Sequence, residues 1–334
     1  MNNFPLASVI IPSFNNENHI NATLNSILEQ DYENLEIIFV NDASTDNTLN
    51  IAEKILRNSK RNFKIINHEK NSGVSTARNT GIKKSSGEYI CFCDGDDLLK
   101  GNYISSLMKK ILEDDCDISF CGMIDKFEDG KPDKLWPIEI KNSKILNGDE
   151  ALKLSLKKYP VAPSVCCMMF KKSFLIENEL NFYDGCSAFE DIEFQLKAFC
   201  RAKKISFISE YLYVYVHSSE MGSVKNSDTK EKKLKRYIDS TGAHYRAAEY
   251  IEKFSASKEI KSVVANILMP EAAIRKFTIL ARMNDKDAYK SLHKDKEIRK
   301  ILLRGLKNFF KKPEIFLKAF IILFIPDLYF MLRK

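Results

Sequence analysis

Three carboxylates within four positions are the residues of this sequence best suited to chemistry. Asp94, Asp96 and Asp97 directly follow the apolar and aromatic run 89–93 (YICFC). Such a run predicts a buried strand, and the acids then lie where the strand emerges. Two ionised carboxylates about 5 Å apart repel each other by roughly 3 kcal/mol at an effective dielectric near 20, and a divalent cation such as Mg²⁺ or Mn²⁺ removes that cost. The pattern therefore predicts a metal site, and its alternative is an ordinary acidic turn in which Asp97 caps the next helix.

The elements that position these acids alternate between apolar runs and amphipathic helical patterns. Ile20, Leu24 and Ile27 show the helical spacing. Strands are predicted at residues 6–11, 35–40, 63–66, 89–93, 118–123, 165–170, 205–208 and 211–216. Strands that alternate with helices over short links indicate an α/β fold with a mostly parallel sheet flanked by helices. Ligands of such sheets bind at the carboxyl ends of the strands.

A second acid follows a second strand. Asp42 ends the run 35–40, and Ser44 or Thr45 is expected to cap the helix that follows. An acid at such a strand end commonly hydrogen-bonds the base or ribose of a nucleotide. A solvated turn aspartate is an equally good interpretation of position alone.

A third acidic stretch opens a helix. Glu190 and Asp191 precede Ile192, Leu196 and Phe199, which recur at helical spacing. Acids in the first turn are favoured by the helix dipole whatever their function. His217 ends the last predicted strand, where a solvated loop histidine is as good an interpretation as a site residue.

Four sequence blocks resemble glycosyltransferase family 2. They are residues 9–15 (VIIPSFN), 40–46 (VNDASTD), 71–82 (NSGVSTARNTGI), and 87–90 (GEYI) followed by 94–97 (DGDD). Their order and spacing across the first hundred residues match the family. Asn41 in place of an acid and Ala43 in place of a glycine are the two departures, and they bear on how the base is held and on the shape of the turn.

The resemblance implies a GT-A fold, a nucleotide-diphospho-sugar donor, with UDP as the expected nucleotide, and Mn²⁺ or Mg²⁺. By analogy Asp42 reads the donor base and Pro12 lines the same pocket. Asp94, Gly95 and Asp96 sit at the ribose and metal, with Arg78 nearby.

The same resemblance assigns the catalytic groups. Asp191 is the expected catalytic base, and Glu190 orients it or contacts the acceptor. His217 is expected to reach the diphosphate or the metal. Residues 218–223 are expected to form a flap over the donor or a simple linker.

The predicted function is an inverting, metal-dependent transfer of one sugar to a glycan or lipid-linked glycan acceptor in surface polysaccharide synthesis. The chain lacks the Gln-x-x-Arg-Trp motif of processive relatives, which favours single additions. One alternative is a sugar nucleotidyltransferase, although residues 12–16 do not form the Gly-rich basic loop typical of that class. The other is a non-catalytic binding scaffold, against which the intact acids argue.

Composition limits the partners and the compartment. The 334 residues carry a net charge of +7, a mild basic bias that falls short of the pattern of a nucleic-acid binder, so no nucleic-acid partner is expected. The 8 cysteines lack zinc-site spacing, which predicts free thiols in a reducing cytosol. Residues 1–4 do not begin a signal peptide pattern.

A change in composition near residue 223 predicts a catalytic domain over 1–223 and a helical extension over 224–334. The extension ends in the apolar stretch 315–326, preceded by Arg304, Lys307, Lys311 and Lys312. This pattern predicts a helix lying on an anionic membrane, and hence a cytoplasmic protein at the inner face of the cell membrane. The alternative is a helix that packs in the core of the extension.

Overall fold

The computed structural model describes residues 4–137, 145–157, 161–217, 229–308, 310 and 312–333. They belong to two compact units. The first takes its residues from Met1–Ala151, Pro160–Cys186 and Arg201–Asn226, and the second from Leu152–Tyr159, Ser187–Cys200 and Ser227–Lys334. The helix that begins at Glu190 therefore groups with the C-terminal helices. The predicted flap 218–223 lies outside the described residues.

The first unit is built on a mixed sheet whose strand order is β3-β2-β1-β4-β8-β6-β9-β5, with β7 beside β6. The strands are β1 Ala7–Ser13, β2 Leu35–Asn41, β3 Asn62–Asn67, β4 Tyr89–Phe92, β5 Leu98–Leu99, β6 Ile118–Phe127, β7 Lys134–Leu135, β8 Met168–Lys171 and β9 Ile205–His217. The pairs β1–β2, β2–β3, β1–β4 and β6–β9 are parallel. The predicted parallel arrangement holds for β1 to β4, whereas β5, β7 and β8 run antiparallel to their neighbours and make the sheet mixed.

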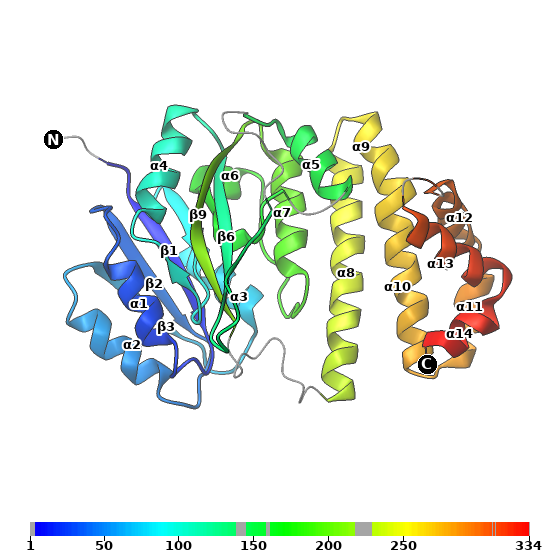
Figure 1. The fold of residues 1–334 in the computed structure, drawn as a ribbon, viewed down its shortest axis with the longest axis horizontal. Helices are drawn as coiled ribbons and strands as arrows, with labels where there is room; N and C mark the ends of the chain where they lie inside the picture. Colours follow the sequence, from blue (N-terminus) through cyan, green and yellow to red (C-terminus); the bar gives the residue numbers. More distant parts are fainter. Residues whose placement is uncertain are drawn as a thin grey trace. The chain divides into compact units, whose positions relative to one another are not determined.

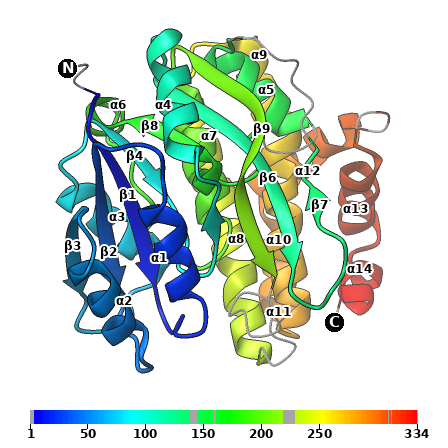
Figure 2. The same ribbon diagram turned by 60° about the vertical axis from the view of Figure 1, so that its left-hand side comes forward.

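Helices cover both faces of this sheet, as Figures 1 and 2 show. They are α1 Ile20–Leu28, α2 Thr48–Arg57, α3 Val74–Lys84, α4 Tyr103–Glu113 and α6 Lys172–Glu177. Helix α1 packs on α2, whereas α3 packs on β1 and β2. Both β1 and β2 are buried along their whole length, which explains their continuous apolar runs. Their carboxyl ends, with that of β4, meet at one edge of the sheet.

Three details differ from the sequence prediction. The predicted strand 165–170 begins as a 3-10 turn, Val165–Cys167, because Ser164 caps it by accepting from the Cys166 amide. The two predicted closing strands form one continuous strand, β9. Helix α2 begins at Thr48, whose amide donates to Asp46, so neither Ser44 nor Thr45 is its cap.

Ser44 and Thr45 instead link the turns that follow β1 and β2. The Asn15 amide donates to Ser44 Oγ (3.1 Å), and the Thr45 amide donates to Asn15 Oδ1 (2.8 Å). The turns at two neighbouring strand ends are therefore tied together.

The second unit is helical. Its helices are α7 Glu190–Arg201, α8 Lys230–Phe254, α9 Lys258–Val263, α10 Met269–Arg282, α11 Lys286–Lys294, α12 Lys296–Gly305, α13 Pro313–Phe324 and α14 Pro326–Arg333, while α5 Gly148–Lys157 begins in the first unit and ends in this one. Helices α8 and α10 run side by side (Figure 1). Glu193 of α7 is buried and pairs with Arg246 of α8 (2.6 Å), so a charged contact joins α7 to the unit.

The C-terminal apolar stretch packs in a core. Ile315, Ala319 and Ile322 of α13 are buried against α10, α11, α12 and α14. The core-packing interpretation is therefore confirmed for this face. The opposite face leaves Leu317 56% and Phe324 58% exposed.

No single helix within the described ranges is long and apolar enough to cross a membrane. Helices α13 and α14 satisfy length and composition only as a pair, and they meet at a bend of 117°.

Candidate active site

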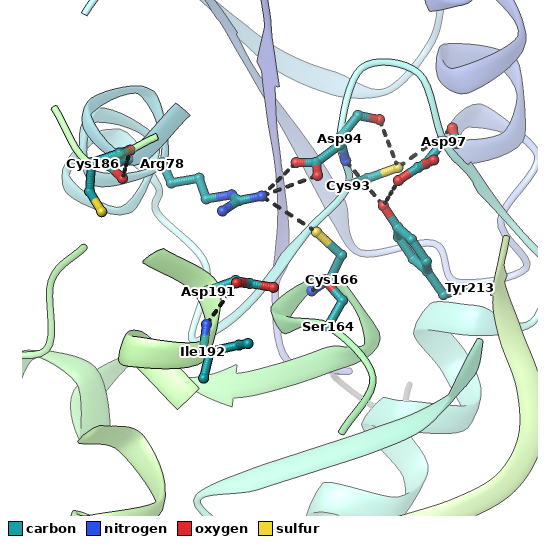
Figure 3. Close-up of polar contacts among 11 residues, drawn as sticks. Arg78, Cys93, Asp94, Asp97, Ser164, Cys166, Cys186, Asp191, Ile192 and Tyr213 are labelled. Carbon is teal, nitrogen blue, oxygen red and sulfur yellow. Dashed lines mark hydrogen bonds and ion pairs between the residues drawn. The ribbon is translucent and has the colours of Figure 1, made fainter. Parts of the chain in front are cut away.

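Asp94 is held by a buried arginine. Nη2 of Arg78, from α3, donates to Asp94 Oδ1 (2.8 Å) and Oδ2 (3.1 Å), as Figure 3 shows. The Arg78 side chain is 3% exposed, and its guanidinium lies over the ring of Phe182 (5.2 Å). Asp94 itself keeps 31% of its side chain exposed. The ion pair thus fixes the carboxylate and leaves part of it accessible to a ligand.

Among the residues that the structure describes, none forms a comparable ion pair with Asp96. Burial and the negative charge of Asp94 raise the pKa of Asp96 to about 6, although His19 and Arg78 act in the opposite direction. The ionised form of Asp96 is therefore incompletely compensated by its surroundings.

This pair of carboxylates suits a divalent cation, because a bound cation would relieve their repulsion. Mg²⁺ is commonly bound by one or two carboxylates together with substrate phosphates. In the part of the chain that the structure describes, no group of three His, Cys, Asp or Glu side chains could hold a metal ion by itself. Asp94 and Asp96 thus fit a cation that shares its ligands with a phosphate-bearing substrate.

Asp97 has a different task from its two neighbours. It is 1% exposed and accepts hydrogen bonds from the Tyr213 phenol (2.5 Å) and the Val216 amide (2.9 Å). Burial and the nearby Asp96 raise the pKa of Asp97. The interpretation of Asp97 as a helix cap is wrong, because its side chain turns inward and anchors the acidic turn to β9 (Figure 3).

Gly95 permits the acidic turn to lie against the end of β1. A Cβ atom at this position would stand 2.7 Å from Ser13 Oγ. Thr23 Oγ1 of α1 donates to the Gly95 carbonyl (3.1 Å). Any larger residue would push the two acids away from the strand ends.

Asp42 is 3% exposed, so the solvated-turn interpretation is wrong. Its Oδ1 accepts from the Ser72 amide (2.9 Å) and lies 2.7 Å from His68 Nδ1, and its Oδ2 accepts from the Gly73 amide (2.7 Å). Gly73 has φ of 88°, a conformation that favours glycine, and directly precedes α3. Asp42 therefore fixes the start of the helix that carries Arg78.

The remaining donor and metal candidates lie at strand ends. Pro12 is buried in β1 opposite Val40. His217 ends β9, where its Nε2 lies 3.0 Å from Asp125 Oδ1 and its ring stacks on Phe127 at 4.4 Å. No described hydrogen bond or ion pair joins His217 to Asp94 or Asp96. The proposed roles of Pro12 and His217 stay predictions.

Glu190 and Asp191 open α7, as predicted. Helix α7 belongs to the second unit, whereas the sequence placed it in the catalytic domain over 1–223. Asp191 Oδ1 accepts from the Ile192 amide (2.7 Å). The preceding residue, Phe189, has φ of 64°, which is strained for an aromatic side chain. Its ring contacts the His244 ring (5.2 Å) and the Arg275 guanidinium (5.2 Å). A strained backbone held by its neighbours thus precedes the acidic pair.

Three residues around Asp42 and the acidic turn were not predicted from the sequence. Tyr213 anchors the acidic turn, His19 lies close enough to lower the pKa of Asp96, and His68 bridges Asp42 and Thr80 Oγ1 (3.0 Å). His68 directly follows β3, and a search for polar residues at every strand end would have found it.

The chain is similar to several proteins that carry names. The family model described as Glycosyl transferase family 2 matches residues 8–176, half of the chain. The chain is 31% identical over 214 residues to "Uncharacterized glycosyltransferase EpsJ" of Bacillus subtilis, a match over 63% of this chain and 61% of that protein. It is 30% identical over 216 residues to poly(ribitol-phosphate) beta-N-acetylglucosaminyltransferase TarS of Staphylococcus aureus, over 64% of this chain and 36% of TarS. The matched region is thus less than two thirds of either relative.

Solved structures share the GT-A fold. Residues 1–349 of S. aureus TarS in complex with UDP-GlcNAc superpose with a TM-score of 0.57 at 23% identity, over 86% of this chain and 90% of that one. Mannosyltransferase PcManGT of Pyrobaculum calidifontis, in complex with GDP-Man and Mn²⁺, gives 0.55 at 16% identity, over 96% and 88%. The sequence motifs, the acidic turn at the sheet edge and the family match agree: this chain belongs to glycosyltransferase family 2.

Proposed function

We propose that this protein transfers one sugar from a UDP-sugar to a hydroxyl group of a glycan or lipid-linked glycan in surface polysaccharide synthesis. The supporting observation is the acidic turn after β4, where Arg78 holds Asp94. Asp96 stands in the same turn, and no cation in the described ranges forms an ion pair with it. The structural neighbour TarS was solved with UDP-GlcNAc, which favours UDP as the nucleotide.

Asp42 is the proposed contact to the donor base. A carboxylate offers about four lone-pair sites, and three of those of Asp42 already face His68, Ser72 and Gly73. The remaining site is an acceptor for the ring N–H of uracil. Pro12 is the proposed wall of the same pocket, and Gly95 keeps the acidic turn close to it.

Asp94 and Asp96 are the proposed holders of Mn²⁺ or Mg²⁺, with His217 as a further contact to the metal or the diphosphate. When bound, such a cation neutralises charge that develops on the diphosphate leaving group. The Mn²⁺ complex of a structural neighbour supports this choice of ion. Arg78 keeps one of the two carboxylates in place.

Asp191 is the proposed general base, oriented by Glu190. It takes the proton of the acceptor hydroxyl while the acceptor oxygen bonds to the anomeric carbon and the bond from that carbon to the diphosphate oxygen breaks. This direct displacement inverts the anomeric configuration. The helix dipole favours the ionised carboxylate that a base needs. Strain at Phe189 supports a functional role for the pair, since such strain clusters at active sites.

A matched pair of variants tests the base. Asp191→Asn should lower kcat by about 10²–10⁴-fold and leave UDP affinity nearly unchanged, and NMR should show an anomeric configuration opposite to that of the donor. Asp287→Asn removes an acid from the first turn of α11 and controls for the helix dipole. Near-normal kcat in Asp191→Asn, or a retained configuration, contradicts the assignment.

The two alternative functions are separated by one assay. A panel of labelled nucleotide sugars with crude acceptor should give labelled glycan if the protein is a transferase. A nucleotidyltransferase would instead release pyrophosphate from a nucleoside triphosphate and a sugar phosphate, and a scaffold would show binding without turnover.

We also propose that the protein is cytoplasmic and binds the inner face of the cell membrane through the outer face of α13 and α14. Met331 and Leu332 of α14 are 67% and 66% exposed, next in sequence to the exposed face of α13. Replacing Leu317 and Phe324 with serine should release the protein from vesicles. Ile176→Ser, at a position 60% exposed in the first unit, is the control. Equal retention of both variants contradicts the proposal.

A further inference from the structure

A cavity of about 430 Å³ lies within the second unit, and none of the residues that line it is assigned above to the donor or the base. Helices α8, α10, α13 and α14 form its walls. Its charged lining comprises four cations and two acids: Arg275, Lys312, Lys318, Arg333, Glu271 and Glu314. Cavities that bind small molecules commonly measure about 300–1,000 Å³, so this one has room for a ligand larger than a single ion.

The cations of this cavity are largely uncompensated. Glu271 is paired with Arg275 (3.3 Å). Within the described residues, Lys312, Lys318 and Arg333 form no ion pair. The Arg333 guanidinium lies 5.7 Å from the ring of Tyr329, which also lines the cavity. Apart from the Arg275–Glu271 pair, the described lining therefore contains three cations and one acid, Glu314.

Arg275 provides an independent sign of a missing ligand. Its Nη1 donates to Ser240 Oγ (3.1 Å), but its buried Nε has no hydrogen-bond partner in the described part of the chain. Buried donors are nearly always satisfied, and an exception calls for a water, an ion or a ligand. The N-terminus of α13 at Pro313 forms part of the same wall, and its partial positive charge favours an anion.

We propose that this cavity binds a phosphate group, carried either by a soluble molecule or by a lipid headgroup. Phosphate presents several charged oxygens to cations that approach from different helices, and arginine recognises it through paired N–H groups. The outer face of α13 is apolar, so a lipid-borne phosphate would reach the cavity from the same helix. None of the lining residues has a role in the proposed transfer reaction, and the test of this site does not require turnover.

The test compares two double variants of the full chain that remove the same charge. Lys312→Gln with Lys318→Gln alters the cavity, whereas Lys290→Gln with Lys300→Gln alters exposed positions of α11 and α12 outside it. Calorimetric titration with inorganic pyrophosphate measures the soluble source, and chelator is present so that the proposed metal-dependent donor site does not contribute to the binding. Sedimentation with phosphatidylglycerol–phosphatidylcholine vesicles, against phosphatidylcholine alone, measures the lipid source. Circular dichroism checks that both variants fold.

The variant with Lys312→Gln and Lys318→Gln should bind either pyrophosphate or the anionic vesicles about tenfold or more weakly than the wild type. The variant with Lys290→Gln and Lys300→Gln should bind both nearly as well as the wild type. A loss only with pyrophosphate identifies a soluble phosphate, and a loss only with anionic vesicles identifies a headgroup. Failure of the wild type to bind in both arms, binding that survives in the cavity variant, or equal losses in both variants would overturn the proposal.

Discussion

The Tyr213 phenol donates to the Asp97 carboxylate across 116 positions of sequence. This contact, together with the bond from the Val216 amide to Asp97, fastens the acidic turn to β9. The turn carries Asp94 and Asp96, so the placement of the proposed metal-binding acids depends on β9, a strand of the same unit that lies far along the sequence.

Tyr213→Phe should lower the free energy of unfolding by about 1–3 kcal/mol, because a buried carboxyl group loses a hydrogen-bond donor. Tyr211→Phe, two residues earlier on β9, is the control, since no described hydrogen bond involves its hydroxyl group. Urea denaturation measures both. Equal stability of the two variants would show that the Tyr213–Asp97 contact contributes nothing.

Asp96→Asn should abolish transfer and yet stabilise the metal-free protein. Chelation should likewise stop transfer by the wild type, and Mn²⁺ or Mg²⁺ should restore it. Because the pKa of Asp96 is raised to about 6 in the folded state, its ionised form opposes folding. The stabilising contribution of the protonated group is complete below the unfolded pKa and is lost as pH rises through about 6.

The stability difference between Asp96→Asn and the wild type in chelator should therefore grow from pH 4 to pH 8. Asp129→Asn, at an exposed position of the same unit, is the control for the removal of a carboxylate. A constant difference across this pH range would show that the ionised form of Asp96 does not oppose folding. Full wild-type activity in excess chelator would show that transfer does not need a metal ion.

Ala43→Gly should stabilise the protein by roughly 0.5–1 kcal/mol, the balance between relief of a left-handed alanine and the greater freedom of glycine in the unfolded chain. Ala43 has φ of 60°, a left-handed conformation that favours glycine. Thermal unfolding measures the change. Ala52→Gly, within α2, should be destabilising and shows that the gain belongs to the turn.

Deletion of residues 313–334 should unfold the second unit, since it removes the Ile315, Ala319 and Ile322 side chains from the core. Circular dichroism and urea denaturation would show a loss of helix greater than the deleted residues account for. A truncated protein with an intact second unit would contradict the core role. Substitutions on the outer face are thus the proper test of membrane binding.

The sequence predicted the site where chemistry and local pattern coincide. Each of the three acids Asp42, Asp94 and Asp96 lies in a turn that follows an apolar run. The strand pattern was therefore enough to predict that they lie at one edge of the sheet. The roles of Tyr213 and His68 were not predicted, because they depend on which strands become neighbours in the sheet, and no local sequence pattern encodes that pairing. The burial of the Asp97 side chain was not predicted either, since an aspartate that caps a helix and an aspartate buried against a strand have the same local sequence pattern. The left-handed backbone at Ala43 was signalled only by the resemblance to the family motif, which has glycine at this position.

The long span between β4 and β9 also has a consequence for biosynthesis. Strands β1 to β4 form local parallel pairs from the first 92 residues, but the partner of Asp97 is made more than a hundred residues later. Domains fold as the chain leaves the ribosome, and distant pairings form last. We therefore expect a nascent chain to pair strands β1 to β4 first. The acidic turn should take its final position only after β9 has emerged from the ribosome.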